Sequence, residues 1–425
     1  MSSTINAATS GGLISTGDTS GQLQLQTAGT TALSISSGQV VTLTNALPIA
    51  SGGTGSTTLA GANIATTNSS TQSINSANTF GFKNRIINGG MVIDQRNAGA
   101  SGTAAGYTLD RWTFGLSQSS KLTWGQNLGS VTPPAGFTKY LGVTSSSAYS
   151  VVASDYFFFQ QFVEGYNMAD LAWGTASAKT VTLSFQVYSS LTGTFGGALQ
   201  NGNASPTYSY PFTYSIPVAN TWTTISVTVA GPTAGTWTNL TNGQGLTLDF
   251  GLGVGSTYSG TAGSWATQNV VSATGATSVV GTSGATLYIT GVQLEVGTQA
   301  TSFDFRDYGR ELMMCQRYYY RNTNSTNTAI ATLANYNTTN AYGGVSLLQA
   351  MRVAPTSSYS SLAHFTYYTT GVPYTLVTLQ SGAGQGAGPT TSEILIQTGS
   401  SWTAGNSGWL RITNANGWID YSAEL

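Results

Sequence analysis

The central part of the chain alternates apolar and polar residues with a period of two. In residues 181–188, 224–229 and 246–254, Val, Ile, Leu or Phe occupies every second position and mostly Thr, Ser, Gln, Asp or Gly lies between. This pattern predicts strands with one buried and one solvated face, because successive side chains of a strand point to opposite sides. Gly-rich connections separate the stretches and no helical period interrupts them. We therefore predict an antiparallel β-sandwich in this region.

The alternation slips once, within residues 286–297. Leu287 and Ile289 occupy odd positions, whereas Val292 and Leu294 occupy even ones. One extra residue in a strand shifts the side-chain parity in this way. We predict a β-bulge or bend near Thr290 and Gly291, where the glycine would tolerate the unusual backbone.

The first 79 residues carry short period-two runs built from small side chains. Pairs such as Leu23 and Leu25 alternate with polar residues, the first aromatic is Phe80, and Asp18 is the only charge. Strands of this kind cannot close a core within one chain, so we expect them to pack against copies of themselves around an axis. This predicts a homotrimeric β-shaft; the alternative is a flexible Ser/Thr/Gly linker.

One segment near residue 310 has a helical pattern. Asp307 can cap a helix that runs towards Arg317 and places Leu312 and Cys315 on one stripe. After it, residues 376–379, 393–396 and 418–425 again look like strands. We therefore predict an all-β protein with an attachment or shaft segment, a sandwich of jelly-roll type, a short helical linker and a sandwich-like β head, at residues 1–79, 80–306, 307–321 and 322–425.

The amino-acid composition narrows the range of possible functions. Charged residues make up only 6% of the 425 residues and the net charge is −1, so no basic stripe exists to neutralise nucleic-acid phosphates. No apolar run approaches the ~18 residues of a membrane span, and the first residues lack the pattern of a signal peptide. Cys315 is the single cysteine, which excludes an intrachain disulfide and predicts a buried thiol. We expect no nucleic-acid binding and no membrane insertion.

The sequence contains few candidates for catalytic residues. His364 is the only histidine, so a His-based metal site or a conventional triad is not expected. Glu164 and Asp170 could form a cleft pair or a calcium site, but turn residues are the preferred interpretation. A second group of acids, at positions 304, 307 and 311, lies among arginines and predicts ion pairs at a domain junction. We expect no enzyme activity, no cofactor and no metal; the enzymatic alternative is a glycan-cleaving tailspike, which needs two suitably spaced carboxylates.

Aromatic residues in Gly/Ser/Thr-rich loops provide candidates for binding. Saccharides offer hydroxyls and flat C–H faces, which match aromatic rings surrounded by amides and hydroxyls. The predicted carbohydrate-binding residues share such loop settings; they are Trp237, Tyr258, Trp265, Tyr336, Tyr342, Trp402 and Trp409. Each could instead anchor its loop against the protein core.

An ordered series of motifs resembles a family. The segments NRIINGGMVIDQRN, YTLDRW, VEGYN and LYITGVQLEVGTQATSFDFRDYGRELMMCQRYYYR, within residues 84–321, resemble those of phage and prophage tail-fibre proteins. The ASGGTG turn at 50–55 is similar to a motif of phage fibres. The resemblance implies a jelly roll similar to carbohydrate-binding domains, and membership of a virion. Gln186 departs from the pattern where relatives carry an aromatic residue, which puts sugar binding by that face in doubt.

Together these observations predict a fibre protein of a phage virion, made in the host cytoplasm, that recognises the host surface. Its expected partners are two further copies of itself, a tail or baseplate protein bound through the N-terminal segment, and a host glycan or outer-membrane receptor. The exposed-looking aromatics of residues 322–425 favour that unit as the tip. The alternatives are a purely structural fibre or connector and a head-decoration protein.

Overall fold

The computed structural model describes residues 3–8, 12–16, 20–43, 83–202, 204–323, 326–381 and 386–425. The chain divides into two compact units, Met1–Thr79 and Phe80–Leu425. The predicted turn at residues 50–55 lies outside the described residues.

The first unit forms one five-stranded sheet with the order β2-β1-β3-β4-β5. Its strands are β1 (Ser3–Ala8), β2 (Gly12–Thr16), β3 (Leu23–Thr27), β4 (Thr30–Ile35) and β5 (Val41–Leu43). β1 and β3 run parallel, while the other neighbours are antiparallel. Between residues 20 and 42, the described side chains are half-buried or exposed and none is buried. The described apolar side chains of residues 20–42 therefore have no core of their own.

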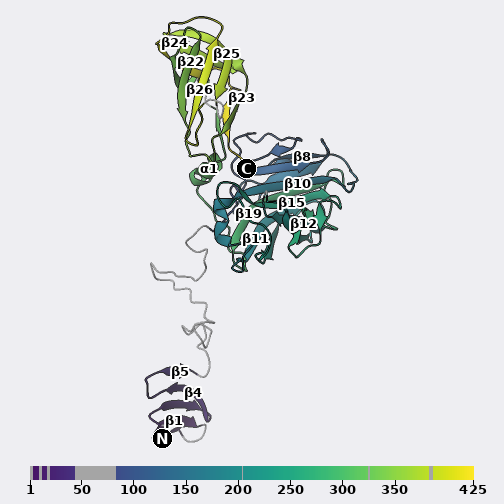
Figure 1. The fold of residues 1–425 in the computed structure, drawn as a ribbon. Coiled ribbons are helices and arrows are strands. Elements are labelled where there is room, and N and C mark those ends of the chain that lie inside the picture. The colour runs from purple at the N-terminus through teal and green to yellow at the C-terminus, as the bar shows by residue number, and fades with distance from the viewer. Residues whose placement is uncertain are drawn as a thin grey trace. The chain divides into compact units, whose positions relative to one another are not determined.

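The second unit begins with the predicted antiparallel sandwich (Figure 1). One sheet has the order β17-β13-β12-β15-β10-β7-β6 and the other β14-β11-β19-β9-β8. The strands are β6 (Gly106–Tyr107), β7 (Trp112–Leu116), β8 (Leu122–Gln126), β9 (Leu141–Ser145), β10 (Tyr156–Glu164), β11 (Val181–Ser189), β12 (Gly193–Gln200), β13 (Tyr208–Ile216), β14 (Thr223–Val229), β15 (Gln244–Val254), β17 (Ala266–Thr267) and β19 (Thr286–Val296). A two-stranded pair, β16 (Ser259–Gly260) and β18 (Ser272–Ala273), and the 3-10 helices Leu128–Ser130, Gly165–Asn167 and Ala169–Leu171 lie in the connections.

The predicted strands supply the sandwich core. Leu183, Phe185 and Phe250 are among its buried residues. The predicted bulge is confirmed, because Ser184 pairs with Gln293 while Gln186 pairs with Thr290, which leaves two residues of β19 opposite Phe185. Gly291 has φ 63°. The bulge lets both Ile289 and Val292 point into the core despite their different parity.

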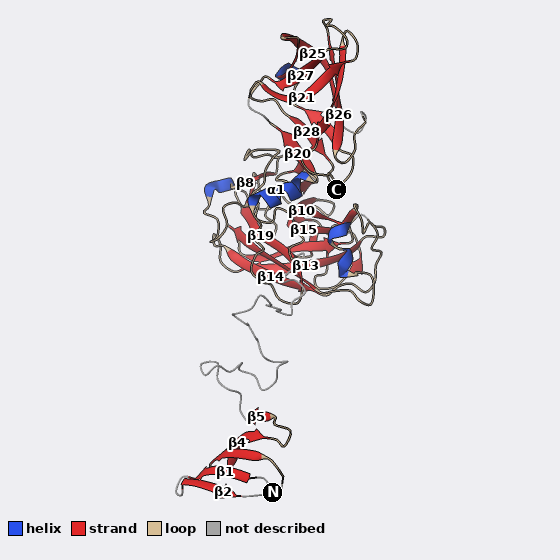
Figure 2. Cartoon of the chain, turned by 90° about the vertical axis from the view of Figure 1, so that its left-hand side faces the viewer, coloured by secondary structure: helices blue, strands red, loops and turns tan. Residues whose placement is uncertain are grey.

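The head is a closed antiparallel barrel of six strands (Figure 2). The strands are β21 (Thr328–Asn335), β22 (Asn340–Ser346), β24 (Phe365–Thr369), β25 (Val372–Ser381), β26 (Thr391–Thr398) and β27 (Ser407–Ile412), in the order β21-β22-β26-β25-β24-β27. The head is all-β as predicted, but it is a barrel and not two open sheets, because β21 pairs with both β22 and β27. Closure removes the open strand edges of a sandwich.

A small sheet joins the head to the sandwich. β20 (Tyr319–Asn322), β28 (Ile419–Ser422) and β23 (Thr356–Tyr359) pair in the order β20-β28-β23, and the 3-10 helix Leu362–His364 follows β23. The predicted helix is α1 (Tyr308–Gln316), and its predicted cap is confirmed because Asp307 Oδ1 accepts a hydrogen bond from the Arg310 amide at 2.9 Å. Cys315 is buried, as predicted. Among the described residues no helix has the length and apolar character needed to cross a membrane.

Candidate functional site

Two of the predicted binding residues, Tyr336 and Tyr342, lie together on the outside of the barrel. Alternation along β22 buries Ala341 in the barrel core and turns Tyr342 outward. Tyr336 follows the end of β21, and its side chain is 75% exposed. The two rings meet edge to face, with centroids 5.4 Å apart. An exposed Tyr336 and a half-buried Tyr342 therefore lie side by side on this surface.

The turn between β21 and β22 holds Tyr336 in place. The Tyr336 amide donates to the Asn340 carbonyl oxygen (2.9 Å). Asn337 Oδ1 accepts from the amides of Thr339 (2.9 Å) and Asn340 (2.7 Å). A side chain that bonds its neighbouring amides in this way stiffens a tight turn. The site is thus organised before any ligand arrives, which lowers the entropy cost of binding.

A shallow pocket of about 300 Å³ adjoins Tyr342. Its lining combines an aromatic ring, open backbone and polar side chains: Tyr342, Gly343, Gly344, Gly386, Thr391, Ser392 and Glu393. A Cβ added at Gly344 would meet nothing within 4 Å, so the backbone is open to a ligand there. Among the described residues the Glu393 carboxylate has no ion-pair partner, and it can accept hydrogen bonds from hydroxyl groups. Aromatic ring, carboxylate and bare backbone together suit a polyhydroxylated ligand.

Trp409, a third predicted residue, lies on a different face of the barrel. It projects from β27, pairs across the strands with Tyr368 of β24, and is 49% exposed. β21 separates this face from the Tyr336 and Tyr342 face, because Thr332 pairs with Trp409 and Ala334 with Tyr342. The sequence prediction of an exposed ring is right for Trp409, but it does not complete the same pocket.

The prediction of an exposed loop ring is wrong for Trp402. This side chain is only 6% exposed and belongs to the barrel core, with edge-to-face contacts to Tyr367 (5.0 Å) and Tyr374 (5.3 Å). Its indole N–H donates to the Asn337 carbonyl oxygen at 2.7 Å. The loop after β26 folds inward, so Trp402 supports the turn that carries Tyr336 and is not free to contact a ligand.

Trp237 and Trp265 form a cluster at the edge of the sandwich. Both are half-buried and pack edge to face with the buried Trp173, at centroid distances of 5.0 and 5.4 Å. Their indole N–H groups donate to the backbone carbonyls of Ala234 and Ala230. With their polar groups satisfied, the two rings act first as loop anchors, as the alternative interpretation of the sequence allowed.

Tyr258 lies beside a stripe of residues that the sequence analysis missed. β10 turns Tyr156, Phe158, Gln160 and Phe162 outward, each half-buried, and Tyr258 meets Tyr156 edge to face at 5.2 Å. Phe157 and Phe159 on the other side of the strand are fully buried. The run of apolar residues at 156–159, where a one-sided strand would alternate, is the sequence signal that both faces of β10 carry aromatics.

A buried acid lies beside this stripe, on the neighbouring strand β15. Asp249 has no exposed surface, and its Oδ1 accepts a hydrogen bond from Gln160 Nε2 at 2.6 Å. Burial raises the pKa of Asp249 well above its usual range, although the bond from Gln160 opposes the rise. Asp249 thus serves the sheet as a buried partner of Gln160.

Glu164 and Asp170 do not form a cleft pair; they lie at the start of one 3-10 turn and within the next, close to the preferred interpretation as turn residues. Glu164 accepts hydrogen bonds from Arg317 Nε (2.8 Å) and the Tyr318 hydroxyl (2.5 Å), whereas Asp170 binds Arg85 (2.7 Å) and approaches Lys179 (3.7 Å). Burial would raise the pKa of Glu164, but the hydrogen bonds from Arg317 and Tyr318 outweigh it and lower the pKa. Separate basic partners leave the two carboxylates without a shared site.

Two of the three acids around α1, Asp304 and Glu311, form the expected ion pairs. Arg306 lies 3.4 Å from Asp304 and 3.3 Å from Glu311, and Asp307 caps the helix. Within the described part of the chain, no group of three or more His, Cys, Asp or Glu residues could hold a metal ion.

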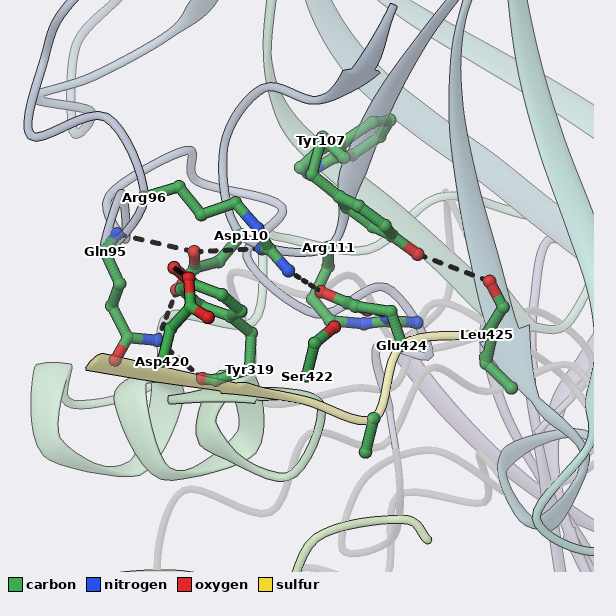
Figure 3. Close-up of polar contacts among 12 residues, drawn as sticks. Gln95, Arg96, Tyr107, Asp110, Arg111, Tyr319, Asp420, Ser422, Glu424 and Leu425 are labelled. Atoms are coloured by element: carbon green, nitrogen blue, oxygen red, sulfur yellow. Dashed lines mark hydrogen bonds and ion pairs between the residues drawn. The ribbon is translucent and has the colours of Figure 1, made fainter. Parts of the chain in front are cut away.

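A network of buried charges fixes the end of the chain to the sandwich (Figure 3). Glu424, two residues beyond β28, pairs with Arg96 at 3.0 Å and with the fully buried Arg111. Arg96 also lies over the ring of Tyr319 at 3.5 Å and approaches Asp110 at 3.5 Å. Burial raises the pKa of Asp110 to about 6, against the opposing effects of Arg96 and Gln95. Buried charges that bind one another in this way are typical of a rigid junction. Each of these charged groups is already bound to a partner within the protein.

Comparisons with known proteins find similarity in structure alone. No protein-family model and no curated protein sequence matches the chain. Among solved structures, the enzymatically active domain of tailspike protein 4 from bacteriophage CBA120 matches with 13% identity and a TM-score of 0.29, covering 50% of this chain and 21% of that one. The family 11 carbohydrate-binding module of cellulase Lic26A-Cel5E from Clostridium thermocellum matches with 11% identity and a TM-score of 0.25, covering 48% and 98%.

A third structure, a putative sugar binding protein from Bacteroides thetaiotaomicron, matches with 10% identity and a TM-score of 0.30, covering 51% of this chain and 100% of that one. This chain thus spans about a fifth of the length of the tailspike structure and nearly all of the other two. TM-scores of 0.30 or less are too low to indicate what this chain binds. Its function has to be argued from its own residues.

Proposed function

We propose that this chain is a receptor-binding fibre protein of a bacteriophage virion, which binds glycans of the host surface without cleaving them. The observation that carries the proposal is the pairing of Tyr336 and Tyr342 beside an open pocket that contains Glu393, whose carboxylate has no ion-pair partner among the described residues. The rings offer flat apolar faces to the C–H side of a sugar, and Glu393 with the open backbone of Gly344 offers partners for its hydroxyls.

The fibre part of the proposal is supported by the N-terminal unit and by the motifs of residues 84–321. The sheet of Met1–Thr79 has strands but no buried described side chain between residues 20 and 42, so copies of the chain would supply the missing core. We propose a homotrimer, docked through this unit to a tail or baseplate protein. Light scattering of the full chain checks the stoichiometry; a stable monomer at micromolar concentration contradicts the trimer.

The proposal that the chain does not cleave glycans is supported by the contacts of four acidic residues. Glu164, Asp170, Asp304 and Glu311 are each held by an arginine. A glycosidase needs one carboxylic acid and one carboxylate across a cleft, about 5 to 9 Å apart, and both must be able to reach the sugar. Each of these carboxylates is instead engaged by an arginine, and, against the effect of burial, hydrogen bonds from their arginine partners lower the pKa of Glu164 and Asp170.

A glycan array probed with the full chain tests the proposal. We expect binding to a subset of bacterial surface glycans, loss of that binding in Tyr336→Ala and Tyr342→Ala, and no shortening of the glycans after prolonged incubation. The matched control is Tyr166→Ala, because Tyr166 is comparably exposed at 62% but lies on the sandwich. Absence of binding to every glycan would favour a structural connector, and shortened chains would favour a tailspike enzyme.

A further inference from the structure

The face of the barrel formed by β24 and β27 carries a second arrangement of aromatic and polar groups. Leu410 and Ile412 of β27 are buried in the core, so Trp409 and Arg411 point outward. On β24 the buried Tyr367 leaves Tyr368 outward. Across the two strands Tyr368 pairs with Trp409. We call this set, Tyr368, Trp409 and Arg411, the Trp409 face.

The Arg411 side chain packs against two aromatic rings. Its guanidinium carbon lies 4.9 Å from the ring centre of Tyr368 and 5.5 Å from that of Trp409. Both distances allow cation–π attraction, which fixes the side chain against the barrel. Its Nε is buried and has no hydrogen-bond partner among the described residues.

Among the described residues Arg411 also has no acidic partner, whereas Asp420 and Glu424 are bound to other arginines. Asp420 pairs with Arg321, and Glu424 pairs with Arg96 and Arg111. Arg352 donates to the carbonyl oxygens of Ala423, Asn242 and Glu424. Within the described residues, no carboxylate lies within ion-pair distance of Arg411. A partly desolvated guanidinium without a carboxylate retains free donors in a fixed fork that matches a planar anion.

Threonine residues lie on the strands next to Trp409 and Arg411. Thr366 pairs across the strands with Arg411, and its Oγ1 lies 3.1 Å from that of Thr413. Thr332, opposite Trp409 on β21, is exposed. Within one face, therefore, a ring half open to solvent, a cation and several hydroxyls occur side by side.

We propose that the Trp409 face binds an acidic saccharide, with the sugar ring on Trp409 and its carboxylate on Arg411. The inference rests on the proposed glycan-binding function and adds the class of ligand. Glu393 gives the Tyr342 pocket the opposite charge, so the two faces would take different sugars. The pocket suits a neutral sugar, and the Trp409 face suits a sugar acid. A surface glycan that contains both kinds of residue could engage the head at two points.

The test uses the full chain on an array of oligosaccharides containing galacturonate, glucuronate or sialate, each printed beside its methyl ester. The ester keeps the sugar and removes the charge. We expect at least tenfold stronger binding to the acid than to its ester, and a loss of that preference as salt is raised. Arg411→Gln should bind acid and ester alike, and Trp409→Ala should weaken both. Phosphorylated oligosaccharides on the same array show whether the anion has to be a carboxylate.

Two controls keep the outcomes distinct. Arg310→Gln removes an exposed arginine of α1 and should keep the preference, and unfolding curves should show all variants folded. An acid preference that survives Arg411→Gln, or equal binding of acid and ester by the unmodified chain, overturns the inference. If neutral glycans still bind through Tyr336 and Tyr342, the proposed function survives that result; if no glycan binds at all, both fail.

Discussion

At the scale of single residues, Trp402 and Trp409 show how similar sequence settings lead to different roles. Both lie among Gly, Ser, Thr and Asn residues, yet Trp402 is buried in the barrel and Trp409 is half exposed. We expect Trp402→Ala to lower the free energy of unfolding by about 3–5 kcal/mol, because it leaves a cavity and removes the bond to Asn337. Trp409→Ala should change it by less than about 0.5 kcal/mol. Urea denaturation of the two variants measures the difference; equal losses would contradict these positions.

The sequence patterns identified the aromatic residues but did not predict which of them are exposed. A loop residue next to Gly has no period from which burial can be deduced, so Trp402 and Trp409 could not be told apart. Tyr336 and Tyr342 flank a short turn, and their proximity follows from the strand pairing, which no local pattern contains. The pairing of the acids was predictable only near α1, where acids and arginines are close in the sequence.

The buried charge of Arg111 supplies a second residue-scale prediction. Arg111 is 1% exposed, and Glu424 is its acidic partner. Glu424→Gln leaves a buried cation without its counter-charge, which costs on the order of 3–5 kcal/mol. Glu393→Gln is the matched control, because among the described residues Glu393 has no ion pair to lose. Thermal unfolding should show a large decrease in Tm for the first variant and almost none for the second; the reverse order would refute the assignment.

At the scale of secondary-structure elements, the bulge in β19 is the feature that the sequence predicted most clearly. A change of parity inside one strand has few explanations other than an extra residue, so the bulge could be predicted without the partner strand. The strands of the sandwich and the cap of α1 followed from equally local patterns. Closure of the barrel did not, because β21 and β27 are some eighty residues apart in the sequence and only their three-dimensional pairing shows that the sheet closes.

Gly291 tests the bulge. It has φ +63°, and a Cβ there would lie 2.6 Å from Phe137 Cζ. Gly291→Ala therefore combines backbone strain with a steric clash, and we expect a loss of about 2–3 kcal/mol in unfolding free energy. Gly284→Ala is the control, because Gly284 has φ +75° but open space around its Cα. It should lose only about 1 kcal/mol. Chemical denaturation that finds the two variants equally stable would argue against the packing of Phe137 on the bulge.

At the scale of the whole molecule, the unit Phe80–Leu425 joins barrel and sandwich through buried charges, and Asp110 makes that joint sensitive to pH. Burial raises its pKa from the usual 3.8 to about 6 in the folded protein. A raised carboxyl pKa means that the folded state holds the proton more tightly, so the associated stability is present below about pH 4 and is lost as pH rises to about 6. The full change corresponds to roughly 3 kcal/mol.

Asp110→Asn removes this titration. We expect the difference in unfolding free energy between the natural chain and the variant to shift by roughly 2 kcal/mol in favour of the variant between pH 4 and pH 6.5. Groups common to both proteins, including Glu164 with its lowered pKa, cancel in the comparison. Calorimetry across this range provides the measurement. A difference that stays constant with pH would show that Asp110 does not titrate there.

The central claim is that the head binds a glycan through Tyr336 and Tyr342. Its most direct test is the dissociation constant of the full chain for the tightest glycan on the array, measured by titration calorimetry beside Tyr342→Ala and Tyr166→Ala. Losing the ring contact should weaken binding about tenfold or more in Tyr342→Ala, with an unchanged Tm, while Tyr166→Ala binds like the natural chain. Equal affinity in all three proteins, or a loss in Tyr342→Ala that follows unfolding, would contradict the account.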